Sequence, residues 1–98
     1  MVKYALYGHM KAKPGKEKEV EAFLQQGAEM AKQEKGTVTW YAIKEAEGQY
    51  GIFDTFDDEP AREAHLNGDI AKALMAKADE LFSELPAIHK IEVLAQKK

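Results

Sequence analysis

Two short runs of β-branched and aromatic residues, joined by a polar turn, constrain the fold of this 98-residue chain more than any other feature. The runs cover residues 37–43 and 50–56, and Glu45–Gly48 supplies the turn, so the pattern predicts a β-hairpin. Side chains alternate along a strand, and both faces of the predicted strands carry large apolar residues. An antiparallel sheet with one solvated face needs only one apolar face, so this hairpin is expected to be covered on both sides.

The spacing of apolar residues before the hairpin predicts one strand and one helix. Residues 2–12 alternate as a strand, and residues 16–35 carry an apolar stripe of helical period. Gly36 is expected to end this helix in a left-handed conformation.

After the hairpin, the pattern predicts a helix pair and a last strand. Residues 57–60 are acidic and end in proline, which is typical of a helix start, and this short helix is expected to reach Leu66. Asp69 is expected to cap a longer helix that ends near Leu85, and residues 88–95 are predicted to form the final strand.

This order of elements predicts an α+β fold of the ferredoxin-like βαββαβ type, in which a four-stranded antiparallel sheet carries its helices on one face. The strands are apolar on both faces, so the second face needs a cover of its own. Another copy of the chain is the simplest cover, which predicts a homodimer through the sheet face, a dimeric α+β barrel. The whole chain, 1–98, is expected to form a single domain.

Composition excludes several classes of function. A formal net charge of −3, with lysine and glutamate interleaved, argues against nucleic acid or an anionic membrane as a partner. The chain has no cysteine, which excludes disulfides and thiolate chemistry. No apolar stretch approaches membrane-spanning length, and a cytoplasmic protein is expected.

Four short segments resemble the antibiotic biosynthesis monooxygenase superfamily. They are Pro14–Lys16, Gly36–Trp40, Gly51–Phe56 and Ala64–Leu66. The resemblance implies a small dimeric α/β barrel of a group that includes cofactor-free oxygenases of quinols and anthrones and haem-degrading oxygenases.

The chain differs from two branches of that superfamily. The haem-degrading branch uses an asparagine on the first strand, a tryptophan on the third and a histidine on the long helix. At the matching places this chain has Gly8, Phe56 and no histidine between Ile70 and Leu85, which disfavours haem degradation. The anthrone oxygenases commonly carry asparagine and tryptophan where this chain has Ile52 and Phe56.

His65 is the candidate general base. It lies one turn after Ala61 on the short helix, where the small residues Ala61 and Ala64 would let the helix lie close over the sheet. A base that titrates near pH 7 is what deprotonation of a phenol or quinol needs before O₂ attacks. The alternative is a histidine that only packs or bonds to a nearby carbonyl group.

Asp54 is a second candidate catalytic residue. Alternation puts it on the same strand face as Ile52 and Phe56, and the resemblance implies that this face is turned toward the helices. A carboxylate on an apolar face is either paired or functional. Arg62, the only arginine, is the favoured partner for a salt bridge, although Arg62 could pair with Asp58 instead.

A group of mostly aromatic and apolar residues is predicted to bind a flat aromatic substrate, although each of them could simply belong to the core. The group consists of Trp40, Phe56, Ile52, Tyr4, Arg62, Met75 and Phe82. His9 and His89 are expected on the dimer side of the sheet, and no third ligand at suitable spacing completes a metal site with them.

Two functions are consistent with these features. The first is a cofactor-independent monooxygenase that oxidises a small electron-rich aromatic of quinol or anthrone type with O₂ and needs no cofactor. The alternative is a non-catalytic protein that binds a small ligand or acts in a stress response. The contacts of the His65 imidazole distinguish the two, because an enzyme needs polar groups that converge on one cavity.

Overall fold

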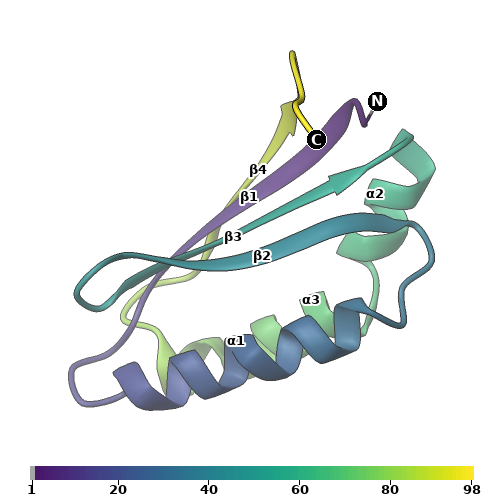
Figure 1. Cartoon of the computed structure of the whole chain (residues 1–98). Coiled ribbons are helices and arrows are strands. Elements are labelled where there is room, and N and C mark those ends of the chain that lie inside the picture. The colour runs from purple at the N-terminus through teal and green to yellow at the C-terminus, as the bar shows by residue number, and fades with distance from the viewer. Residues whose placement is uncertain (1) are drawn as a thin grey trace.

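The computed structural model describes residues 2–98 and forms a four-stranded antiparallel sheet with helices on one face (Figure 1). The strands are β1 (Tyr4–Lys11), β2 (Thr37–Ala46), β3 (Gln49–Phe56) and β4 (Ala87–Glu92), in the order β2-β3-β1-β4. The helices are α1 (Glu17–Ala31), α2 (Glu59–Leu66) and α3 (Asp69–Leu81). The predicted ferredoxin-like α+β fold is confirmed. Within residues 2–98, no helix is long and apolar enough to cross a membrane.

The predicted hairpin is formed by β2 and β3. Gly48 lies in its turn with a φ of 73°, a conformation that L side chains rarely adopt. The register places Trp40 opposite Asp54 and Ala42 opposite Ile52, so these four residues share one face of the sheet. That face is the one that the helices cover.

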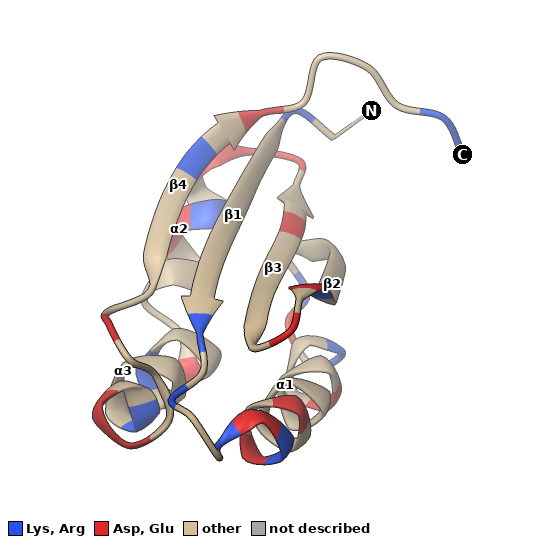
Figure 2. Cartoon of the chain, turned by 90° about the vertical axis from the view of Figure 1, so that its left-hand side faces the viewer, with Lys and Arg blue, Asp and Glu red and all other residues tan. Residues whose placement is uncertain are grey.

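The covered face and the open face of the sheet differ in exposure. Buried side chains of β1 and β3 on the covered face pack against α1 and α3 in a core made of Met10, Val20, Leu24, Tyr50, Ile52, Leu74, Ala78, Leu81 and Phe82. On the open face, Tyr41 is 57% exposed and Ile43 is also exposed. Figure 2 shows β4, β1 and β3 side by side in the sheet. Asp54 is the one acidic residue of β3, and it is buried on the covered face.

Helix α1 ends four residues earlier than predicted, at Ala31, and Gly36 does not cap it. Among residues 2–98 the glycines with positive φ are Gly15 and Gly48, so the left-handed conformation expected at Gly36 is wrong. Gly36 is needed for a different reason. A Cβ atom there would lie 3.0 Å from the Ala61 Cβ, so glycine lets the segment after α1 pass close to α2.

Both boundaries predicted for α3 also need correction. Gly68, and not Asp69, occupies the N-cap position. The helix ends at Leu81 and not near Leu85, because the following backbone pairs with the end of β1: Phe82 bridges to Ala12, and Ser83 N–H donates to the Lys11 carbonyl group at 2.9 Å. The last strand ends at Glu92, three residues before its predicted end.

Candidate functional site

The His65 imidazole lies between two carboxylates. Its Nε2 atom is 2.9 Å from Asp54 Oδ2, and its Nδ1 atom is 2.6 Å from Glu34 Oε1. An ionised carboxylate can only accept hydrogen bonds. Nδ1 is hydrogen-bonded to Glu34 and Nε2 lies within ion-pair distance of Asp54, so two ionised carboxylates favour an imidazole that carries a proton on both nitrogens.

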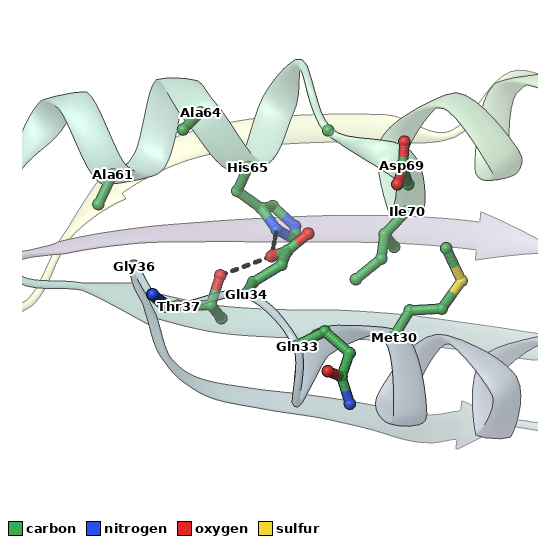
Figure 3. A pocket seen from close by; sticks show the side chains of 12 residues that line it. Met30, Gln33, Glu34, Gly36, Thr37, Ala61, Ala64, His65, Asp69 and Ile70 are labelled. Carbon is green, nitrogen blue, oxygen red and sulfur yellow. Dashed lines mark hydrogen bonds and ion pairs between the residues drawn. The ribbon is translucent and has the colours of Figure 1, made fainter.

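Three separate elements position this cluster. Helix α2 begins where the Asp58 side chain accepts a hydrogen bond from Ala61 N–H at 2.8 Å, and it presents His65 to the sheet. Asp54 lies in β3 opposite Trp40, and Glu34 lies in the turn after α1. Figure 3 shows Glu34 between His65 and Thr37, whose Oγ1 hydroxyl donates to Glu34 Oε1 at 2.7 Å.

Burial and the neighbouring charges perturb the cluster. The side chains of Asp54, His65 and Glu34 are 2%, 7% and 22% exposed. Burial raises the pKa of Asp54, and its hydrogen bond to His65 opposes this rise only in part. Burial by itself would lower the pKa of His65, but the hydrogen bonds to Asp54 and Glu34 outweigh it and raise this pKa. The two carboxylates therefore favour the cationic form of His65.

A small cavity, here called the inner cavity, lies between the sheet and α2 and α3. Its volume is about 40 Å³, and it is lined by Leu6, Gly8, Met10, Trp40, Ile52, Asp54, His65, Leu66, Ile70, Ala71, Leu74 and Ile88. Two polar atoms of its lining residues, Asp54 Oδ1 and Trp40 Nε1, are buried and have no hydrogen-bond partner within residues 2–98. A buried polar atom without a partner is unusual and is often a place where a ligand or water binds.

A larger depression, here called the outer pocket, lies on the other side of His65. Its volume is about 450 Å³, and Figure 3 shows its lining side chains. The lining residues are Met30, Gln33, Glu34, Lys35, Gly36, Thr37, Ala61, Ala64, His65, Gly68, Asp69 and Ile70. His65 and Ile70 line both spaces, so their side chains form the partition between the inner cavity and the outer pocket.

The structure brings four of the predicted site residues together: His65, Asp54, Trp40 and Ile52 all line the inner cavity. The ring of Phe56 packs beside that of His65, with 5.4 Å between the two centroids.

Arg62 does not join this group. Asp54 is paired, as predicted, but its partner is His65. Arg62 instead donates to the carbonyl groups of Ile91 at 3.2 Å and Ala5 at 3.4 Å. Its guanidinium also lies 5.1 Å from the ring centroid of Tyr4, a residue of β1. The alternative pairing of Arg62 with Asp58 is not formed, because the Asp58 carboxylate caps α2.

Two predicted substrate-binding residues also lie elsewhere. Met75 is half exposed on α3, and Phe82 is buried in the core next to Ala12. Glu34 was not among the predicted site residues, since the sequence pattern assigned it to a continuing helix. The only feature of the sequence that indicates a site role for Glu34 is its carboxylate side chain.

A second group of polar side chains, here called the open-face cluster, consists of Tyr7, His9 and Glu45. Tyr7 donates to Glu45 Oε2 at 2.6 Å, and His9 Nδ1 lies 2.9 Å from Glu45 Oε1. His89 stacks on the Tyr7 ring, with 6.4 Å between centroids. Within residues 2–98, no group of three or more His, Cys, Asp or Glu side chains is arranged to hold a metal ion.

The chain belongs to the antibiotic biosynthesis monooxygenase family, whose model matches residues 4–77. A solved structure of a protein of unknown function from Nitrosomonas europaea is 47% identical, with a TM-score of 0.96, and the match covers 100% of this chain and 95% of that one. No curated protein matches the chain.

More distant solved structures share the fold. A Mycobacterium tuberculosis protein is 16% identical with a TM-score of 0.85, and the match covers 98% of this chain and 99% of that one. A Pseudomonas aeruginosa protein is 18% identical with a TM-score of 0.80, and the match covers 97% of both chains.

Proposed function

We propose that this protein is a cofactor-independent monooxygenase that oxidises a small, hydroxylated, electron-rich aromatic of quinol or anthrone type with O₂. The observation that carries this proposal is the unpaired oxygen, Oδ1, of the buried Asp54 carboxylate, a residue that lines the inner cavity. A substrate hydroxyl group is the donor that this acceptor lacks. Membership of the antibiotic biosynthesis monooxygenase family supports the class of reaction.

In the proposed reaction, the substrate supplies the electrons and O₂ is the oxidant. Asp54 takes the hydroxyl proton of the enol form of an anthrone, and the resulting anion donates an electron pair to O₂, so that a carbon–oxygen bond forms. The peroxide anion is protonated and then loses water, which leaves a carbonyl group. A methylene group and O₂ thus become a carbonyl group and water, with one oxygen atom in each product.

The inner cavity must widen to admit such a substrate. A water-sized probe needs about 10–15 Å³, so the present 40 Å³ suits no more than a few waters. Ligand pockets usually span about 300–1,000 Å³. Leu66, Ile70 and Leu74 come from the helices and are the side chains whose displacement would open the cavity. Trp40 Nε1 would then donate to a second oxygen of the ligand.

Oxygen uptake by flavin-free, chelator-treated protein tests this function against a panel of quinols and anthrones. Asp54→Asn should lower the rate by about 10²-fold or more, because it removes the proton acceptor. Asp57→Asn is the matched control, since Asp57 is exposed and should leave the rate unchanged. Activity that persists in Asp54→Asn contradicts the mechanism. Saturable binding without oxygen uptake would instead support the non-catalytic role of a protein that binds a small ligand or acts in a stress response.

We also propose that a second copy of the chain covers the open face of the sheet. Three large apolar side chains of β2, Val38, Tyr41 and Ile43, are exposed there or beside it. Large apolar side chains left exposed along one strand favour an interaction site, and a symmetric homodimer is the commonest assembly.

A further inference from the structure

We propose that Asp54, His65 and Glu34 form a proton path between the inner cavity and the outer pocket, in which Glu34 is the group that exchanges protons with solvent. The proposal rests on the proposed function and adds to it a proton route and a residue, Glu34, that the reaction at Asp54 does not by itself require.

The contacts run in series and use each imidazole nitrogen once. Asp54 Oδ2 faces Nε2 at 2.9 Å, and Nδ1 faces Glu34 Oε1 at 2.6 Å. A histidine that only needed one charged partner would leave its second nitrogen free or bonded to a carbonyl group. An imidazole with an acceptor at each nitrogen can take a proton on one side and release one on the other.

The two ends of the path lie in different environments. Asp54 lines the inner cavity, where the other lining side chains are almost all apolar. Glu34 lines the outer pocket together with Lys35 and Asp69. Among Asp54, His65 and Glu34, the side chain of Glu34 is the most exposed. Exposure therefore rises along the path from Asp54 to Glu34, as a route from a closed site to solvent requires.

The structure holds Glu34 in place more firmly than a turn residue needs. Its Oε1 atom accepts from Thr37 as well as from His65, and its backbone N–H donates to the Ala31 carbonyl group at 3.0 Å. A Cβ atom at Gly36 would lie 3.0 Å from the Ala61 Cβ, which is tighter than an ordinary contact, so glycine lets the segment that follows Glu34 pass close to α2.

The charged groups around His65 are arranged so that Glu34 is the route by which its proton reaches solvent. Asp54 approaches from β3, and Glu34 approaches from the turn after α1. Arg62, on the same helix as His65, is directed toward the carbonyl groups of Ala5 and Ile91. Lys35 and Asp69 line the outer pocket and surround its Glu34 end.

The proton balance closes over the two halves of the proposed reaction. When a ligand hydroxyl gives its proton to Asp54, His65 passes its Nδ1 proton to Glu34, and Glu34 releases it to water in the outer pocket. The number of protons on the three groups and their summed charge are unchanged. After O₂ has added, neutral Asp54 returns its proton to the peroxide anion, and Glu34 takes a proton from solvent and restores His65.

Glu34→Gln tests the path in turnover, because glutamine keeps the size and the hydrogen-bond acceptor but cannot carry the proton. We expect kcat to fall by about 10- to 100-fold with KM unchanged. Small buffers such as imidazole, which the outer pocket can admit, should restore part of the rate as their concentration rises. Glu29→Gln is the matched control, since Glu29 pairs only with Lys32 at the surface of α1 and should behave as wild type. A Glu34→Gln variant with wild-type kcat, or with a lowered kcat that buffers do not restore, overturns the proposal.

A second measurement needs no substrate and separates failure of the path from failure of the proposed function. Imidazole NMR of the ligand-free protein reports the pKa of His65 and the exchange of its N–H protons with water. In Glu34→Gln the pKa of His65 should fall and the exchange should slow, whereas Glu29→Gln should change neither. Unchanged exchange in Glu34→Gln overturns the path, even if quinol oxidation is observed. Slowed exchange supports the path, even if no tested substrate is oxidised.

Discussion

The two faces of the sheet each carry a histidine bonded to a carboxylate, and the two clusters behave differently. His65 and Asp54 on the covered face are 2.9 Å apart, and so are His9 and Glu45 on the open face. Burial separates them: the first two side chains are 7% and 2% exposed, the other two 26% and 30%. The hydrogen bond from Tyr7, followed by that from His9, lowers the pKa of Glu45, whereas burial raises the pKa of Asp54.

Burial, more than the contact itself, decides whether the pKa of the carboxylate in a histidine–carboxylate pair is raised or lowered. Water around Glu45 stabilises the ionised form, so added hydrogen bonds simply favour the charge. Asp54 has lost that water and depends on His65 for its charge. A carboxylate that readily accepts a proton is suited to general base catalysis, and a strongly ionised surface carboxylate is not.

The largest expected effect is on folding stability when each histidine is removed. His65→Leu leaves the Asp54 charge buried without its partner and should lower the free energy of unfolding by about 3–5 kcal/mol. His9→Leu should cost no more than about 1 kcal/mol, because its pair is partly solvated. Urea denaturation measures both values. Similar losses for the two variants would mean that burial does not distinguish the clusters.

The second expected effect concerns what covers the open face. Light scattering should give about twice the 11.0 kDa chain mass for the wild type, with a buried area of about 1,600 Å² or more. Tyr41→Asp places a charge on that face and should yield the monomer mass. Lys72→Asp, on the exposed side of α3, is the control and should remain dimeric. A monomeric wild type would contradict the proposed dimer.

The smallest expected effect is a difference in pH dependence. The pKa of His65 is raised in the folded state, so its stabilising contribution is complete below pH 6.5 and is lost as pH rises through the raised value. Glu45 has a lowered pKa, so its contribution is present above 4.5 and is lost as pH falls through the lowered value. Urea denaturation across pH should show this alkaline loss disappearing when both members of the pair are replaced, as in His65→Leu with Asp54→Leu, because Asp54 left alone would itself lose stability as it ionises. The acid loss should become smaller in Glu45→Gln, where Glu63, whose pKa is also lowered, still contributes.

The sequence predicted the faces of the strands more reliably than the contacts between side chains. Alternation along β3 groups Asp54 with Ile52 and Phe56, because the period of a strand is fixed by backbone geometry, and the family resemblance turns this face toward the helices, where Asp54 is buried. The partner of Asp54 was assigned by charge to Arg62. The choice between Arg62 and His65 depends on how α2 is rotated over the sheet, and that rotation is set by packing that no local pattern records.

The sequence does not predict the site role of Glu34, for a related reason. Residues 32–35 are polar and continue the helical period, so nothing in the sequence marks the end of α1 at Ala31. The sequence predicts that Gly36 caps the helix, but its role is to let the chain approach Ala61. That role appears only when two segments distant in the sequence are brought together.

Trp40 is the only tryptophan in the chain, and it lies at the wall of the inner cavity. A Cβ atom at Gly27 would lie 3.0 Å from the Trp40 Cη2 atom, so α1 rests directly on this indole. The tryptophan fluorescence of the protein therefore originates from one position, which contacts the first helix, the hairpin and the cavity at once. Its emission wavelength and quenching report unfolding and occupation of the cavity optically, without any added label.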